Sequence, residues 1–274
     1  MNTIPVGSFE DNCLSEIAEA AKDERLAALS LQWMHASAKY KYTYHFKALG
    51  RPVIQFPQDI VAIQELIWET KPDLIIETGI AHGGSLVLSA SMMALLDYCD
   101  AVRSGQVLDP KTPQRRVLGV DIEIRAHNRM AIDSHPMSHR INMIEGSSID
   151  PKIIRRVHDL AAPYKRILVC LDSNHTADHV FAELLAYAPL VSIDSYCIVF
   201  DTVVEWSPDH LNSGRPWMRG NSPLTAVERF LALVKTDTLQ GADGTRLKFA
   251  VDSQIDARLL ISTAANGYLK RISA

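Results

Sequence analysis

Polar side chains capable of chemistry follow five predicted strands, each at the point where an apolar run ends. They are Glu77, Asp121, Ser147 with Ser148, Asp172 with His175, and Asp201. In an open α/β sheet, ligands bind just outside the carboxyl ends of the strands. Carboxylates, hydroxyls and an imidazole gathered there can hold a cation, bind the hydroxyls of a ligand and transfer a proton. The pattern therefore predicts one ligand site with acid–base chemistry.

A glycine-rich turn follows the first of these strands and reads Glu77-Thr-Gly79-Ile-Ala-His82-Gly83-Gly84-Ser85. A strand, a tight turn and a helix start aim backbone N–H groups and a positive helix end at a ligand. The glycine spacing departs from the Gly-x-Gly-x-x-Gly fingerprint of dinucleotide sites, so we expect a ligand without a pyrophosphate. The structural alternative is a helix cap with close packing of the strand on the helix.

The next two strand ends suit a nucleoside. The Asp121 carboxylate can accept hydrogen bonds from both hydroxyls of a ribose. Ser147 or Ser148 can address a base edge, although helix capping explains a serine there equally well. These residues extend the predicted site along the sheet edge.

The elements that must position these groups alternate along the chain. Apolar runs predict parallel strands at 74–77, 116–121, 141–145, 166–171 and 195–200, with helices at 60–70, 86–99, 151–162, 178–187 and 224–235. Asp59 is expected to cap the helix at 60–70. Further strands at 248–251 and 259–262, and an Asn266-Gly267 turn before 268–272, predict antiparallel pairing at the end. We predict a mostly parallel sheet with helices on both faces.

An N-terminal extension, 1–52, precedes the α/β domain of 53–274. It contains a predicted helix over 9–38 and then an aromatic and basic segment, 39–47. That segment is either an edge or subunit surface, or a lid over a polar substrate. A second irregular segment follows the fifth strand and carries Trp206, Arg215, Trp217 and Arg219. Those side chains suit a sugar ring with neighbouring anionic groups, or else pack as a loop or subunit contact.

Composition sets the broad class. The 274 residues are 47% hydrophobic and 22% charged, with a net charge of −4, as expected of a soluble protein with no nucleic-acid partner. The cysteines, Cys13, Cys99, Cys170 and Cys197, are predicted to be free thiols. The N-terminus shows no signal-peptide pattern, and no apolar run is long enough for a transmembrane segment. We expect a cytoplasmic protein.

Six blocks of the chain resemble the cephalosporin hydroxylase and rhamnosyl O-methyltransferase family, within the class I S-adenosylmethionine-dependent methyltransferases. The blocks lie at 56–59, 71–79, 120–128, 145–150, 171–176 and 266–271. The resemblance implies a Rossmann-like methyltransferase fold, a small-molecule or glycan acceptor and a homo-oligomer. It also implies that S-adenosylmethionine lies along the strand edge, against Glu77, Gly79, His82, Gly83, Ser85, Asp121, Ser147, Ser148 and Asp172.

The resemblance further implies a divalent cation, most often Mg²⁺, on Asp172 and Asp201. Many members carry Glu-Asp at the second place, where this chain has Phe200-Asp201, so one carboxylate is missing. Asn174, Thr202, Glu205 or water are candidates for the absent oxygen. Mg²⁺ tolerates this because it keeps several waters and takes one or two carboxylates. Capping of the following turns is the alternative role for both aspartates.

His175 is the predicted catalytic base, and Asp172 is the second predicted catalytic residue. It follows Asp172 by three residues, where related catechol methyltransferases place a lysine base, and an imidazole titrates near neutrality. The alternative is a hydrogen bond that shapes the loop. We predict a Mg²⁺-assisted, S-adenosylmethionine-dependent O-methyltransferase acting on a sugar or natural-product hydroxyl. Hydroxylation, a nicotinamide-dependent reaction and a non-catalytic cofactor-binding partner are the other hypotheses; for hydroxylation, the sequence shows no two-His-one-carboxylate spacing.

Overall fold

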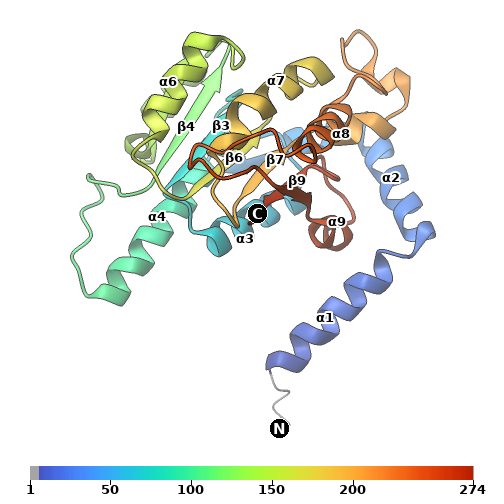
Figure 1. Cartoon of the computed structure of the whole chain (residues 1–274), viewed down its shortest axis with the longest axis horizontal. Coiled ribbons are helices and arrows are strands. Elements are labelled where there is room, and N and C mark those ends of the chain that lie inside the picture. The colour runs from blue at the N-terminus through green and yellow to red at the C-terminus, as the bar shows by residue number, and fades with distance from the viewer. Residues whose placement is uncertain (1–5, 274) are drawn as a thin grey trace.

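The computed structural model describes residues 6–273 and is built around a seven-stranded sheet (Figure 1). The strand order is β5-β4-β3-β6-β7-β9-β8. The strands are β3 (Leu74–Thr78), β4 (Arg116–Asp121), β5 (Ile141–Glu145), β6 (Ile167–Leu171), β7 (Tyr196–Val199), β8 (Phe249–Val251) and β9 (Tyr268–Arg271). The strands β3 to β7 pair in parallel, whereas β9 runs antiparallel to both β7 and β8. The predicted fold class, with its antiparallel C-terminal pair, is confirmed.

Helices cover both faces of the sheet (Figure 1). One face is covered by α3 (Pro57–Thr70), α4 (Gly84–Ser104) and α9 (Ser253–Leu259), and the other by α6 (Pro151–Ala161), α7 (Ala177–Tyr187) and α8 (Pro223–Val234). All five residues of β3 and of β6 are buried, as expected of parallel strands between two helical layers. The short helix α5 (Ala126–Asp133) follows β4.

The chain turns back at β3, and this places the site. From β3 it moves outward to β4 and β5, and then crosses to β6 on the other side of β3. The carboxyl ends of β3 and β6 therefore meet at a topological switch point, where α/β sheets bind ligands. Asp172 N donates to Thr78 O at 2.9 Å across this junction.

The N-terminal extension differs from its prediction. Two helices, α1 (Val6–Ala20) and α2 (Glu24–Ala38), replace the single helix predicted over 9–38. Asp23 breaks the run, because its side chain caps α2 by accepting from Leu26 N at 3.0 Å. Figure 1 shows α1 extending away from the sheet. A hairpin of β1 (Phe46–Ala48) and β2 (Arg51–Val53), which the sequence did not indicate, follows the 3₁₀ turn η1 (Tyr42–His45).

The strand predicted at 259–262 is wrong. Residues 253–259 form α9, and the segment after it is a turn. Asp252 starts this helix because its carboxylate accepts from the backbone N–H groups of Gln254 and Ile255. Only Leu259 of the predicted strand belongs to this helix, and Leu260 has a positive φ of 58°. Ser262 Oγ and Thr263 N donate to Asp59 instead of to a neighbouring strand.

Four other predictions concern the cysteines, a transmembrane segment, the domain boundary and a signal peptide. All four cysteines are free, as predicted, and Cys170 and Cys197 are buried. Within residues 6–273, α4 is long and apolar enough to cross a membrane by length and composition, although its buried side packs on the sheet. The absence of a transmembrane segment, the domain boundary after residue 52 and the absence of a signal peptide stay predictions. The last rests partly on residues 1–5, which lie outside the described residues.

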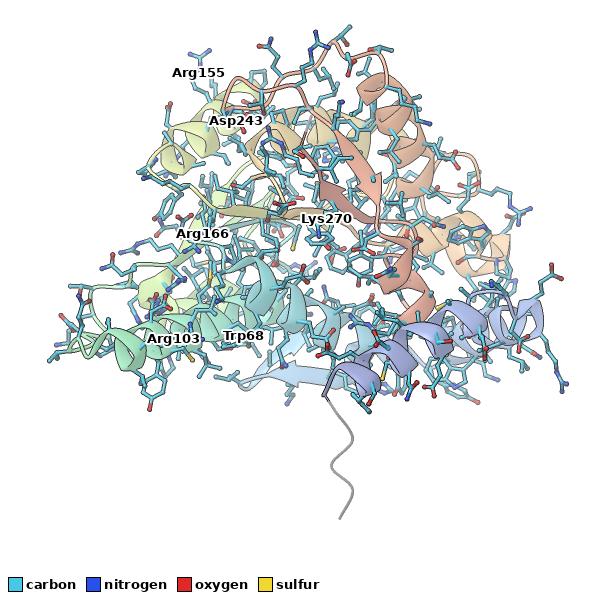
Figure 2. The ribbon with its side chains drawn as sticks, turned by 60° about the horizontal axis from the view of Figure 1, so that its bottom comes forward. Trp68, Arg103, Arg155, Arg166, Asp243 and Lys270 are labelled. Carbon is cyan, nitrogen blue, oxygen red and sulfur yellow. The ribbon has the colours of Figure 1, made fainter. Side chains whose placement is uncertain are left out.

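The end of α4 is tied to the sheet by a buried ion cluster. Asp97 accepts from Arg115 Nη1 at 2.5 Å and from Arg140 Nη1 at 2.5 Å, and all three side chains are buried. Asp100 holds the outer side of Arg115 at 2.7 Å and is half exposed. On the outer surface of the helices, Arg103 lies over the Trp68 ring, 5.8 Å from its centroid (Figure 2).

Replacing Asp97 tests this cluster. Asp97→Asn leaves two buried guanidinium groups without their shared carboxylate, so the free energy of unfolding should fall by about 3–5 kcal/mol. Asp100→Asn removes an exposed partner of the same arginine and should cost about 1 kcal/mol or less. Urea unfolding followed by circular dichroism measures both. Equal losses in the two variants would show that burial does not set the strength of this cluster.

Candidate active site

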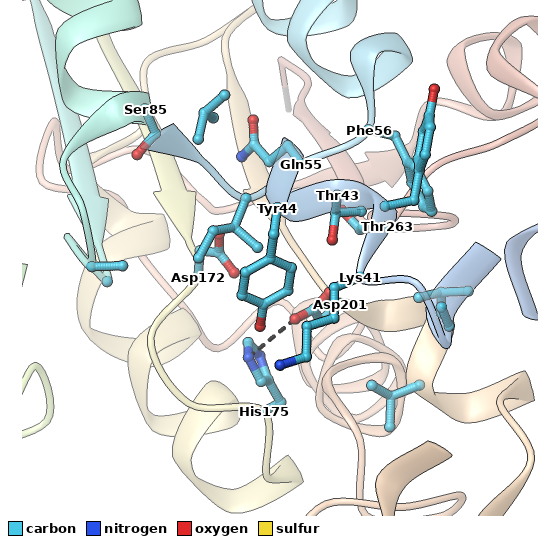
Figure 3. A pocket seen from close by; sticks show the side chains of 18 of the residues that line it. Lys41, Thr43, Tyr44, Gln55, Phe56, Ser85, Asp172, His175, Asp201 and Thr263 are labelled. Carbon is cyan, nitrogen blue, oxygen red and sulfur yellow. Dashed lines mark ion pairs between the residues drawn. The ribbon is translucent and has the colours of Figure 1, made fainter. Parts of the chain in front are cut away.

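A cavity of about 790 Å³ lies over the carboxyl edge of β3, β6 and β7. Four segments supply most of its lining: the glycine turn at 79–85, the loop after β6, the segment after β7, and the N-terminal stretch from Met34 to Phe56. Arg125 and Thr263 complete it. Figure 3 shows the side chains of Lys41 and Tyr44 directed toward His175, near Asp172 and Asp201.

Asp172, His175 and Asp201 form one cluster in the cavity wall. One ligand atom from each lies within 4.8 Å of the others. His175 Nε2 is 3.0 Å from Asp201 Oδ2, and the Trp217 ring meets the imidazole edge-on with centroids 4.7 Å apart. The three residues that the sequence singled out for chemistry are therefore brought together.

The electrostatics of the cluster favour a cation. Burial raises the pKa of Asp172 well above its ordinary value, and the negative charges of Asp201 and Glu77 raise it further. Within residues 6–273, no hydrogen bond reaches the Asp172 carboxylate, and Asp201 precedes the 3₁₀ helix η4 (Thr202–Trp206) without a side-chain cap. Capping thus does not explain either aspartate. Two carboxylates and an imidazole fit a divalent cation that keeps several waters.

None of the three side chains considered for the missing oxygen points to the cluster. Asn174 Oδ1 accepts from the Thr176 backbone, and Thr202 Oγ1 donates to the carbonyls of Thr263 and Ala265. Glu205 accepts from Gly220 N, Ser222 Oγ and Thr225 Oγ1, and so it holds the loop before α8. Of the candidates named from the sequence for the missing oxygen, water is therefore the one that remains.

The glycine turn packs tightly against two neighbouring segments. Gly79 has a φ of +91°, and a side chain there would meet the backbone of Asp172 and Ser173. A side chain at Gly84 would meet the backbone of Pro52. The glycines therefore permit the close approach that joins the turn to the loop carrying the cluster.

Backbone donors of the turn are used differently from the prediction. The Ile80 and Ala81 N–H groups donate to Asp121 Oδ2 at 2.8 and 3.1 Å, rather than facing the cavity. The expectation that these N–H groups point to a ligand is wrong, because the carboxylate on the adjacent strand takes them. Whether Asp121 also holds ribose hydroxyls stays a prediction.

Two residues that the sequence did not single out clamp the turn from outside. Arg51 Nε donates to His82 O at 2.9 Å, and Arg51 Nη2 donates to Asn128 Oδ1 at 3.1 Å. Asn128 Nδ2 in turn donates to Ala81 O at 2.9 Å. Asn128 closes one of the six resembling blocks, which was a usable signal, whereas nothing in the sequence marked Arg51.

The remaining predicted cofactor residues divide into two groups. Gly79, His82, Ser85 and Asp172 line the cavity. The others do not line it: Glu77, Gly83, Asp121, Ser147 and Ser148. Ser148 is buried, with its hydroxyl 3.0 Å from His179 Nε2. The structure brings the turn and the cluster together, while contacts of this second group with a cofactor stay predictions.

The segment at 39–47 supports its lid interpretation. Lys41, Tyr42, Thr43 and Tyr44 line the cavity. Tyr42 anchors the segment, because its ring lies 5.1 Å from the Trp33 centroid and 5.1 Å from that of Phe46. An N-terminal stretch remote in sequence thus forms one wall of the site.

Sequence comparison identifies the family. The sequence model of the family described as rhamnosyl O-methyltransferase/CmcI matches residues 40–272. The chain belongs to this family. The match includes residues 40–47 of the aromatic and basic segment as well as the whole sheet. The predicted resemblance is therefore confirmed.

Similar proteins include two curated relatives and a solved structure. The rhamnosyl O-methyltransferase of Mycobacterium bovis is 32% identical over 154 residues, which are 55% of this chain and 54% of that protein. The Mycobacterium leprae protein of the same name is 28% identical over 161 residues, covering 58% and 62%. The MycE methyltransferase in complex with Mg and SAH is 15% identical, with a TM-score of 0.45, and the match covers 78% of this chain and 48% of that one. The chain thus aligns with about half the length of its curated relatives.

The departure from the family pattern at Phe200 has a structural explanation. The Phe200 side chain is buried in the core beneath the sheet edge, and Phe200 N donates to Leu171 O at 3.0 Å. Position 200 therefore contributes packing, while His175 lies beside Asp201 as the third polar group of the cluster.

A buried carboxylate supports Asp201 from below. Asp59 is fully buried and accepts from Ser262 Oγ at 2.6 Å, Tyr268 OH at 2.9 Å and Thr263 N at 2.9 Å. The Thr263 carbonyl accepts in turn from Thr202 Oγ1 and Val203 N, directly after Asp201. The prediction that Asp59 caps α3 is wrong, because Asp59 faces inward and Phe56 occupies the cap position without a side-chain bond.

Asp59→Asn tests this support. Both carboxylate oxygens accept from donors, so an amide N–H₂ in either orientation faces donors and leaves them unsatisfied. We expect the free energy of unfolding to fall by about 1–3 kcal/mol. The exposed residue Asp159 provides the control, since Asp159→Asn should change the free energy of unfolding by about 0.5 kcal/mol or less. Chemical denaturation measures both, and an unchanged Asp59→Asn protein would contradict the role.

Glu77 makes the stability depend on pH. Burial raises the pKa of Glu77 to about 8, although the Ser85 hydroxyl, which donates to it, lowers the value. The folded state then holds a proton that the unfolded state has lost, so this contribution falls as pH rises from about 4.5 to about 8. Unfolding of wild type and Glu77→Gln should be compared across this range. Relative to wild type, Glu77→Gln should gain stability with rising pH, by up to about 1.4 kcal/mol per unit; a constant difference would contradict the assignment.

Proposed function

We propose that this chain is an S-adenosylmethionine-dependent O-methyltransferase that methylates a hydroxyl of a sugar or natural product with the help of a divalent cation, most simply Mg²⁺. One observation carries the proposal: a single cavity is lined both by the glycine turn and by Asp172, His175 and Asp201. Family membership supports the reaction class. The names of the relatives support a rhamnosyl or related acceptor. A homo-oligomer and a cytoplasmic location stay predictions.

The chain's residues divide the work of the reaction. The glycine turn and residues 41–44 would hold S-adenosylmethionine and the acceptor in one cavity, where alignment of the two favours an in-line displacement. The new O–C bond would form as the C–S bond breaks, and the electron pair of the broken C–S bond would stay on sulfur. The hydroxyl proton must go to a nearby base, and His175 is the candidate. Bound S-adenosylmethionine supplies the methyl group, and a cation on Asp172 and Asp201 would lower the pKa of the hydroxyl.

His175 has two alternative roles at one nitrogen. His175 Nε2 lies 3.0 Å from Asp201 Oδ2, so a proton on Nε2 would face that carboxylate and leave Nδ1 as the basic nitrogen of the neutral ring. If Nε2 binds the cation instead, the imidazole acts as a ligand. The described cluster contains one histidine and two carboxylates, and this set supports cation-assisted transfer over the two-histidine, one-carboxylate site of non-haem iron oxygenases.

Calorimetry with possible cofactors tests the proposal without a known acceptor. S-Adenosylhomocysteine should bind the wild-type protein, and NADH should not. Mg²⁺ should raise the midpoint temperature of wild type by a few degrees, because binding to the folded state stabilises it. Asp201→Asn should lose this increase.

The exposed Asp209 provides the matched control. Asp209→Asn removes a carboxylate from the same segment without touching the cluster, so its response to Mg²⁺ should equal that of wild type. Binding of NADH without binding of S-adenosylhomocysteine would refute the methyltransferase proposal. An undiminished Mg²⁺ effect in Asp201→Asn would remove the cation from this cluster.

A further inference from the structure

The cavity is lined by three cationic side chains that have no acidic partner. They are Lys41, Arg125 and Arg215. Among the residues that the structure describes, none of the three forms an ion pair, although many other arginines do. Charged groups that converge on a cavity without partners are available to a ligand of opposite charge.

The charges of the cavity favour an anion on the acceptor side. Asp172 and Asp201 are the carboxylates among the lining residues, and a divalent cation at their cluster would balance both. S-Adenosylmethionine carries a sulfonium, an ammonium and one carboxylate, so it adds positive charge. The three cationic side chains, which are exposed to solvent, then have no negatively charged partner in the cavity. A neutral acceptor would leave these cations without a partner, whereas an anionic acceptor would pair with them.

The position of Arg215 indicates where the anion lies. Its guanidinium carbon is 5.2 Å from the Trp217 ring centroid, and Trp217 meets His175 at 4.7 Å, beside Asp201. Trp217 lines the cavity between His175 and Arg215, and the part of its ring that Arg215 does not cover offers aromatic surface to the apolar side of a sugar ring. A ring on Trp217 would present one hydroxyl to the cluster and its substituent to Arg215.

Lys41 approaches from the opposite wall. It begins the turn η1 from a left-handed backbone conformation with a φ of 52°. Figure 3 shows its side chain directed toward His175 and Asp201, beside Tyr44. Cations from two segments far apart in sequence thus flank the space next to the cluster.

We infer that the acceptor is a sugar carrying an anionic group, a phosphate or a carboxylate, which Arg215 and Lys41 bind while the ring lies against Trp217. The planar fork of Arg215 suits two oxygens of such a group, and Lys41 adds a point charge. This inference rests on the proposed function and narrows its substrate class.

Binding to the protein loaded with S-adenosylhomocysteine and Mg²⁺ tests the inference. The probes are two matched pairs: α-L-rhamnose 1-phosphate with methyl α-L-rhamnopyranoside, and methyl α-D-glucuronide with methyl α-D-glucopyranoside. In at least one pair, the anionic sugar should bind at least about tenfold more tightly than its neutral partner. The pair with this preference shows whether the site selects a phosphate or a carboxylate. In Arg215→Gln and in Lys41→Gln, this preference should fall below about threefold.

Arg219→Gln is the control for charge in the same loop. Arg219 lies outside the cavity lining, and its Nε donates to the Glu205 carbonyl, so this variant should keep the full preference. Equal or absent binding of anionic and neutral probes would overturn the inference. Weakened binding of S-adenosylhomocysteine in Arg215→Gln or Lys41→Gln would also overturn it, since those cations would then hold the donor's carboxylate. If wild type does not bind S-adenosylhomocysteine at all, the proposed function itself fails.

Discussion

The close approach of β3 and β6 at their carboxyl ends is the constraint on which the site depends. Gly79 leaves β3 against the backbone of Asp172, and Asp172 N donates to Thr78 O at 2.9 Å. A side chain at Gly79 would separate the turn from the loop of Asp172. Because the two segments touch, a ligand held by the turn is automatically placed beside the carboxylates, and binding and chemistry share one cavity.

This arrangement gathers several carboxyl groups that are fully or partly shielded from solvent. Burial raises the pKa values of Glu77, Asp172 and Asp59, and Asp201 faces Asp172 across the cluster. Each carboxylate has a different compensation. Glu77 accepts from Ser85, and Asp59 accepts from the loop at 262–263, whereas Asp172 receives no such donor within residues 6–273. Asp172 is therefore the carboxylate whose charge a bound cation would balance, and the proposed chemistry centres on it.

Much of the fold was predictable because it follows from local patterns. Strands buried on both sides produce continuous apolar runs, and their polar ends reveal the shared edge. The errors arose where a side chain acted at long range or as a cap. Asp59 looks like a helix cap in sequence, yet its partners lie about 200 residues later, at Ser262 and Thr263. Asp252 caps α9, which ends at Leu259, so the apolar run predicted as a strand at 259–262 lies at the end of a helix and in the turn after it.

The sequence by itself determined the fold class, the family and the cluster of Asp172, His175 and Asp201, because the alternation of strands and helices, the polar strand ends and the motif spacing are local patterns along the chain. Only the tertiary structure decided what surrounds that cluster. It showed that Asp121 accepts from two N–H groups of the turn, that Arg51 clamps the turn, and that Lys41 and Arg215 line the same cavity. The physical reason is that these contacts join segments far apart in sequence, so that no local pattern encodes them.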